Sequence, residues 1–154
     1  MPLLRVQGIE QLQALAGQEL GTSGWLDITQ DRMTAFADAS LDHQWIHVDV
    51  ERARRESPYG VTIAHGFFTL SLVSELRRQV FEFEGPYRYA VNYGLNRVRF
   101  PAPVPAGSRV RGRFTLQSVE VLENAIALTL LVTVEVEGGS KPALVAEWLL
   151  RYYR

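Results

Sequence analysis

The chain has 154 residues, 16 basic and 17 acidic side chains, a formal net charge of −1 and no cysteine. This balanced charge gives no reason to expect a nucleic acid or an anionic membrane as a partner. The absence of cysteine excludes disulfides, thiolate metal ligands and a cysteine nucleophile. The length and a hydrophobic content of 47% predict a single domain spanning residues 1–154.

The N-terminal residues show no basic region followed by an apolar core, so they do not resemble a secretory signal. No apolar run approaches the roughly 20 residues that cross a bilayer, and we expect a cytoplasmic protein. Ile9, Leu12 and Leu15 follow helical spacing and Gly17 offers a stop, which predicts a helix over 6–18. Residues 1–19 are therefore expected to form a helical N-terminal extension.

The next elements are a short strand, predicted over 21–28, and a helix. Thr29 provides the N-cap of this helix, and apolar side chains keep helical spacing as far as Ser40. The segment 41–63 has no regular pattern apart from a brief helical stretch over 50–56. We therefore expect most of this segment to be irregular.

Residues 66–83 give the strongest helical pattern, because apolar side chains occupy most of the helix circumference. Such a helix is buried at the centre of a domain. Four β-rich runs follow, joined by turn and hairpin signals, over residues 89–100, 109–121, 125–137 and 144–153. One buried helix followed by four long strands predicts an α+β fold, in which a curved antiparallel sheet wraps around a long central helix.

Two short stretches hold all three histidines and carry the chemistry of the chain. Asp42 and His47, five positions apart, supply a carboxylate and a base that titrates near neutral pH. Gly66 follows Ala64-His65 and opens the apolar helix, where first-turn N–H groups lack partners and the helix dipole favours negative charge. An isolated Asp-x4-His pattern is usually structural, but the second stretch at this spacing favours an active site for a polarised carbonyl.

The chain resembles the MaoC-like (R)-specific enoyl-CoA hydratases, and within them the nodulation-protein-N-like branch. The resemblance covers roughly residues 20–154 and rests on three motifs: Asp42-x-Gln44-x-x-His47-x-Asp49, Ile63-Ala64-His65-Gly66 and Asn92-Tyr93-Gly94-Leu95-Asn96-Arg97-Val98-Arg99-Phe100-Pro101. It implies a single hotdog fold, usually paired into a homodimer. Where the family has Asn-Pro, this chain has Gln44-Trp45, a departure that bears on substrate fit more than on reaction type.

The resemblance also implies roles for individual residues. Asp42 and His47 would activate water, and the N–H of Gly66 would bind the thioester oxygen. Gln44 would help to position the water through its amide. Two further positions keep a second interpretation: His65 either positions substrate or packs, and Ser74 bonds either near the acid or to its own helix backbone.

The activity implied is the reversible hydration of a trans-2-enoyl-CoA to an (R)-3-hydroxyacyl-CoA, without a cofactor or a metal. The thioester carrier is coenzyme A or an acyl-carrier protein. A hotdog acyl-CoA thioesterase is the alternative enzyme, with Glu75 on the central helix as its carboxylate. A non-catalytic module that binds acyl thioesters is the third hypothesis.

A metal pair of His43 and His47, with Asp42 and Asp49 as extra ligands, is disfavoured because no known ligand pattern supports it. Arginines at alternating strand positions either meet coenzyme A phosphates or form a solvated sheet face, and they stay unassigned: Arg97, Arg99, Arg109, Arg111 and Arg113.

Overall fold

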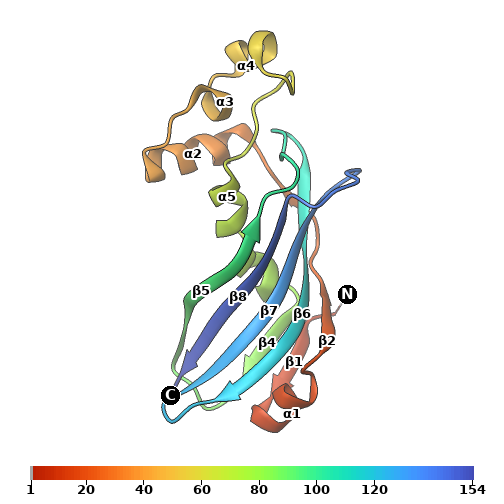
Figure 1. The fold of residues 1–154 in the computed structure, drawn as a ribbon, viewed down its shortest axis with the longest axis vertical. Helices are drawn as coiled ribbons and strands as arrows, with labels where there is room; N and C mark the ends of the chain where they lie inside the picture. The colour runs from red at the N-terminus through yellow and green to blue at the C-terminus, as the bar shows by residue number, and fades with distance from the viewer. Residues whose placement is uncertain (1) are drawn as a thin grey trace.

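A computed structural model describes residues 2–154, in which a curved antiparallel sheet forms the body of the molecule (Figure 1). The strands run in the order β2-β6-β7-β8-β5, and a short β3 also pairs with β6. Their bounds are Gln18–Thr22 for β2, Leu26–Asp27 for β3, Tyr89–Arg99 for β5, Arg109–Val121 for β6, Ala125–Val136 for β7 and Leu144–Tyr153 for β8.

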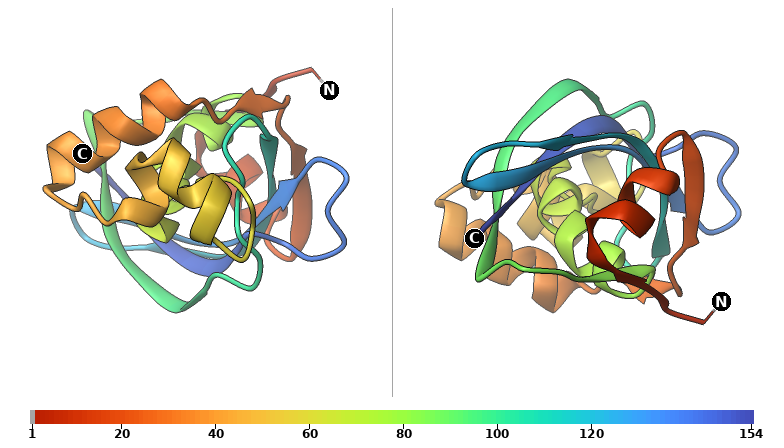
Figure 2. Two further views of the ribbon diagram at one scale, coloured as in Figure 1. Left: turned by 90° about the horizontal axis from the view of Figure 1, so that it is seen from above. Right: turned by 90° about the horizontal axis from the view of Figure 1, so that it is seen from below.

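The three strands β6, β7 and β8 show why the sequence folds this way. Buried and part-buried side chains alternate along β7, along β8 and along β6 as far as Leu116, so one face of the sheet is apolar and must be covered. The sheet curls around the helices α5 (Gly66–Ser71) and α6 (Val73–Arg78), as Figure 2 shows from both ends. Leu76 of α6 and Phe114 of β6 are fully buried in this core.

The central helix is shorter than predicted. Leu72 separates α5 from α6, and α6 ends at Arg78, so the helix predicted over 66–83 is wrong in its last part. Residues Phe81–Glu84 form strand β4, which pairs in parallel with β1 (Leu4–Gln7). The prediction was wrong here because the apolar residues of this segment fit both the helical and the strand period. In the structure Phe81 and Phe83 alternate with exposed glutamates along a strand.

The N-terminal elements also differ from expectation. Helix α1 covers only Gly8–Ala14, between strands β1 and β2. The strand expected over 21–28 is interrupted between β2 and β3. In this gap the N–H of Ser23 donates to the carbonyl of Gly112, and the Ser23 hydroxyl accepts from the N–H of Gly112. The assignment of residues 1–154 to one domain with an N-terminal extension over 1–19 stays a prediction.

Three helices lie together at one end of the sheet (Figure 1): α2 (Gln30–Ser40), α3 (Trp45–Val48) and α4 (Val50–Glu56). The predicted start of α2 is confirmed, because the Thr29 hydroxyl accepts a hydrogen bond from the N–H of Arg32 at 3.3 Å. The four-residue α3 was not predicted. No helix within residues 2–154 is long and apolar enough to cross a membrane.

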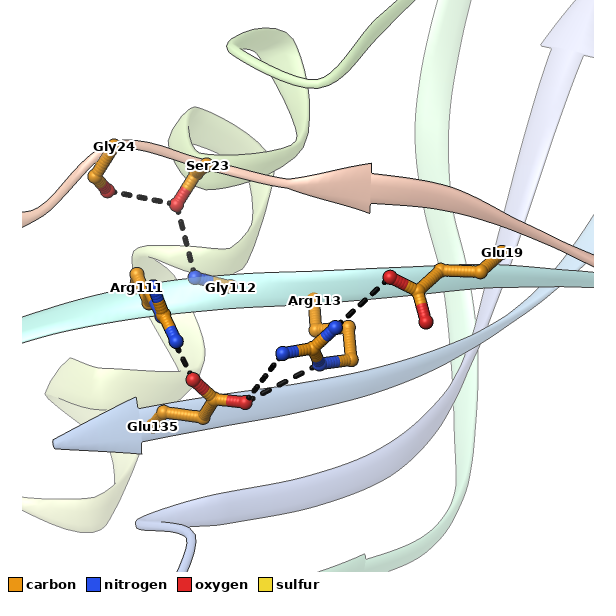
Figure 3. A network of polar contacts seen from close by, with 7 residues as sticks. All are labelled: Glu19, Ser23, Gly24, Arg111, Gly112, Arg113 and Glu135. Carbon is orange, nitrogen blue, oxygen red and sulfur yellow. Dashed lines mark hydrogen bonds and ion pairs between the residues drawn. The ribbon is translucent and has the colours of Figure 1, made fainter. Parts of the chain in front are cut away.

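The junction between β2 and β6 carries a polar network (Figure 3). The Ser23 hydroxyl accepts from the N–H of Gly112 at 2.9 Å, and Glu135 binds both Arg111 and Arg113. Arg113 also binds Glu19 of β2 at 2.9 Å, and Arg109 pairs with Glu137. These three arginines of β6 are thus engaged by carboxylates of the sheet itself.

Candidate active site

A cavity of about 450 Å³ lies where α2 and the loop after it meet the N-terminal end of α5. Its lining combines predicted catalytic residues with aromatic side chains: Phe36, Ser40, Asp42, His47, His65, Gly66, Phe67 and Phe100. Three of the six predicted site residues were expected to be catalytic, namely Asp42, His47 and Gly66. The fold brings all three to this one cavity.

His47 lies on α3 and is buried, with 7% of its surface exposed. Its Nδ1 lies 2.6 Å from the carbonyl oxygen of Ile63. A carbonyl only accepts, so Nδ1 carries the proton and Nε2 is left with its lone pair. Burial lowers the pKa of His47 below its ordinary value of 6.5, and the nearby His65 acts in the same direction, against the raising effects of the Ile63 bond and the Asp42 charge. The imidazole is therefore a neutral base at pH 7.

His65 packs against the ring of His47. Its Nε2 lies 2.9 Å from the backbone oxygen of Asp42, to which it donates by the same argument. The two imidazole rings stack, with centroids 3.8 Å apart and planes 23° apart. The Nδ1 of His65 is buried and has no hydrogen-bond partner within residues 2–154. His65 thus connects the backbone at Asp42 to the ring of His47.

The turn that follows α2 holds Asp42, which lines the cavity. Leu41 ends the helix in the left-handed region, with φ of 62°. The Asp42 carboxylate then accepts from the backbone N–H of Gln44 at 3.3 Å. A carboxylate oxygen of Asp42 and one nitrogen each of His47 and His65 lie within 4.8 Å of one another. The side chain of Asp42 is exposed, so it remains accessible to water.

The same three groups have the composition of a metal site, but the ring geometry disfavours one. An ion bound to an imidazole lies in the ring plane, along the nitrogen lone pair, at about 2 Å. The planes of two rings stacked at 3.8 Å and inclined by 23° converge too far away for both to reach one ion. The metal pair of His43 and His47 is disfavoured as well. His43 binds Asp38 at 2.8 Å, and the side chain of Asp49 caps α4.

Gly66 is the first residue of α5, and within residues 2–154 no acceptor is found for its N–H. A Cβ at this position would lie 3.1 Å from the ring of Phe100. The φ of Gly66 is not in the left-handed region, so close approach, and not backbone conformation, accounts for the glycine. The arrangement leaves a free N–H donor at the helix N-terminus, on a residue that lines the cavity.

Two of the predicted positioning residues do not line this cavity. Gln44 contributes its backbone N–H to Asp42, and its side chain is exposed. Ser74 lines a neighbouring cavity of about 300 Å³, together with apolar side chains that include Leu95 and Trp148. Phe67 lines both cavities. The interaction of Ser74 with the acid therefore is not present in this geometry.

Sequence reasoning did not place Phe36 or Phe100 in the wall of the cavity. Phe36 of α2 lies 5.0 Å from the ring of His65, and Phe100 covers Gly66. Phe36 is one of the apolar side chains whose helical spacing predicted α2, and that spacing by itself does not indicate a cavity. Phe100 belongs to the strand motif of the family resemblance, but that motif gave it no role at the site, since Phe100 follows the last residue of β5 and reaches Gly66 only through the fold of the sheet.

A central helix wrapped by an antiparallel sheet, with a cavity at the start of that helix, defines the hotdog class of proteins. The profile of the MaoC like domain matches residues 11–138 of this chain. The 3-hydroxyacyl-thioester dehydratase Z of Mycobacterium tuberculosis is 53% identical over 147 residues, which cover 95% of this chain and 96% of that protein. The chain therefore belongs to the MaoC-like dehydratase family.

The branch and the fold predicted from the sequence are confirmed. Nodulation protein N of Rhizobium meliloti is 48% identical over 147 residues, covering 92% of this chain and 88% of that protein. The (R)-hydratase of A. caviae involved in PHA biosynthesis has a TM-score of 0.67 at 23% identity, covering 88% of this chain and 94% of that chain. At this low identity the likeness supports the fold alone.

Proposed function

We propose that the protein is an (R)-specific enoyl-CoA hydratase, which adds water reversibly to a trans-2-enoyl thioester to give an (R)-3-hydroxyacyl thioester. One observation carries the proposal: the lone pair of His47 Nε2, the Asp42 carboxylate and the unpartnered N–H of Gly66 belong to a single cavity. A base and an oxyanion donor in one cavity are what hydration of a polarised alkene needs.

In the proposed reaction, Asp42 and His47 hold a water molecule between them. Nε2 of His47 takes a proton from this water while its oxygen bonds to the β-carbon of the alkene. The electron pair moves to the thioester oxygen, which accepts a hydrogen bond from the N–H of Gly66. The enolate then receives a proton at the α-carbon from the Asp42–His47 pair, which completes the addition without a cofactor. Dehydration follows the same steps in reverse.

The substrate is proposed to be a thioester of coenzyme A, with acyl-carrier-protein thioesters as a second carrier. The neighbouring apolar cavity, with Leu95 and Trp148 in its wall, offers space for an acyl chain beyond Phe67. Ser74 lies in that second cavity and would face the acyl chain. The name of the M. tuberculosis relative, a dehydratase of 3-hydroxyacyl thioesters, supports this substrate class.

The geometry gives less support to the two alternatives. Glu75, the candidate carboxylate of a thioesterase, binds Arg78 at 2.6 Å and does not line the catalytic cavity. The hydrogen bond from Arg78 lowers the pKa of Glu75 and holds it as an ion pair. A non-catalytic binding module would not need the base, the acid and the free donor together.

We also propose a homodimer. Strand β5 is at one end of the sheet and, within residues 2–154, pairs only with β8, so its outer edge is open. Large apolar side chains are exposed along it: Tyr89, Val91, Tyr93 and Leu95. Open apolar edges pair with other chains unless they are covered, and a second copy would provide that cover. The cytoplasmic location stays a prediction.

The experiment is a hydration assay with crotonyl-CoA and longer trans-2-enoyl-CoA substrates, followed by chiral analysis of the product. A hydratase bleaches the enoyl-thioester absorbance without releasing thiol and gives the (R) product. Thiol release would identify a thioesterase, and binding without either change would identify a binding module. Asp42→Asn should lose activity, whereas Asp38→Asn, on the exposed side of the same helix–loop region, should retain it. An (S) product would contradict the proposal.

A further inference from the structure

The side chain of Gln30, in the first turn of α2, bridges two segments that are distant in the sequence. Its Nε2 donates to the backbone oxygen of His47 at 2.8 Å, and its Oε1 accepts from the Thr62 hydroxyl at 2.5 Å. A weaker bond from Nε2 to Thr34 at 3.3 Å uses the remaining amide proton. The amide thus has a partner on each of its three polar positions.

The orientation of this amide is fixed by its partners. The backbone oxygen of His47 can only accept, so the NH₂ group of Gln30 must face it. The amide oxygen then faces Thr62, whose hydroxyl must donate. Thr62 is 1% exposed, and its own carbonyl accepts from the N–H of Ala106 at 2.9 Å. The two hydrogen bonds of Gln30, to the backbone oxygen of His47 and to the Thr62 hydroxyl, form a clamp on His47. This clamp is anchored in the buried part of the fold through Thr62.

The helix that carries His47 needs such support. It has four residues, Trp45–Val48, and a helix of this length is not stable by itself in water. Beyond the clamp, it is held to the 62–64 segment by the bond from the N–H of Ile63 to Ile46 at 3.0 Å and by the bond from the His47 ring to Ile63. All three attachments converge on the residues around His47, and two of them involve His47 directly.

We infer that Gln30 and Thr62 are positioning residues that fix the backbone and ring orientation of His47. The inference rests on the proposed function in so far as His47 is the base of the reaction. Neither side chain lines the catalytic cavity, so their action passes through His47. Without the bridge made by Gln30, the backbone oxygen of His47 loses its side-chain partner and α3 is held only by its two bonds to Ile63, so Nε2 no longer faces the water in a single orientation.

The test uses Gln30→Leu and the near-isosteric Thr62→Val. Each should lower kcat about 10- to 100-fold with little change in KM, since misplacement of a catalytic group by about 1 Å costs up to about 10²-fold. Thr62→Ser keeps the hydroxyl and should restore most of the rate. Gln13→Leu, an exposed glutamine of α1, serves as the matched control and should leave kcat unchanged. Thermal unfolding identifies any variant that fails to fold.

The His47→Gln background decides whether the effect passes through His47. Gln30→Leu should cause no further loss there, because the group that it positions is already absent. An equal fold-loss in both backgrounds, or no loss in either, would overturn the inference. If the wild-type protein has no hydratase activity, the proposed function fails and imidazole ¹⁵N NMR decides instead. His47 should be only in its Nδ1–H form in the wild type and in both tautomers in Gln30→Leu; one tautomer in both would overturn the clamp.

Discussion

Gly66→Ala tests the proposed position of the thioester most directly. The added Cβ would lie 3.1 Å from the ring of Phe100, so that ring must move back by a few tenths of an ångström. Phe100 is 39% exposed and can yield, so we expect the free energy of unfolding to fall by less than about 1 kcal/mol. The methyl group would also enter the cavity beside the N–H that is proposed to bind the thioester oxygen.

Loss of that one hydrogen bond should lower kcat by about 10²- to 10³-fold, or about 2.7–4 kcal/mol. The assay is kcat and KM for crotonyl-CoA hydration, with thermal unfolding measured on the same samples. Gly24→Ala is the matched control, because that glycine has an ordinary φ and its added Cβ would meet only the flexible end of Gln79 at 3.4 Å. Gly66→Val should lose both turnover and stability.

A second variant separates the two consequences of the added methyl group. In Gly66→Ala combined with Phe100→Leu, the crowding against the ring is relieved while the methyl group stays in the cavity. We expect this double variant to remain as inactive as Gly66→Ala. Full recovery of kcat would refute the reasoning, since the loss would then come from displacement of Phe100. Unchanged kcat/KM in Gly66→Ala alone would show that the carbonyl does not bind at this N–H.

The remaining predictions concern the catalytic pair, pH, the turn and assembly. Asp42→Asn and His47→Gln should each lower kcat about 10²- to 10⁴-fold, with the double variant little worse than the more damaging single one; near-full activity in either would exclude the mechanism. Because burial lowers the pKa of His47 below its ordinary value of 6.5, the fall of kcat/KM in acid should have its midpoint below pH 6.5. As the pH falls, His47 takes up its proton in the unfolded state at a higher pH than in the folded state. The free energy of unfolding of the wild type should therefore decrease as the pH falls below about 6.5, and that of His47→Gln should not show this decrease. Leu41→Gly should raise the free energy of unfolding by about 1 kcal/mol in urea titrations, because it relieves a left-handed conformation at a side chain that is 81% exposed; a decrease would contradict this. Light scattering at micromolar concentration should give the mass of a dimer, and a monomer would count against pairing through β5.

Much of the sheet could be predicted because its period is local. The strands β6 and β8 were predicted with the bounds that the structure has, since buried side chains alternate along the whole of β8 and from Val110 to Leu116 in β6. Strand β1 was missed because four residues carry too little pattern, and its partner β4 is 77 positions away at the pairing of Leu4 with Phe81. The predicted end of the central helix was wrong for the same reason. Only the pairing with β1 decides that Phe81 and Phe83 extend as a strand.

The sequence by itself determined the chemical inventory of the site: a carboxylate and an imidazole five positions apart, and a glycine that opens an apolar helix. It also determined the antiparallel fold, because side-chain period and turn signals are properties of neighbouring residues. Only the tertiary structure decided that Phe100 closes over Gly66, that His65 stacks on His47, and that Ser74 belongs to a different cavity. It alone placed the Gln30 amide between the Thr62 hydroxyl and the backbone oxygen of His47. These contacts join segments that are far apart in the chain, and their geometry is set by how the sheet curls around the helix, which no local pattern encodes.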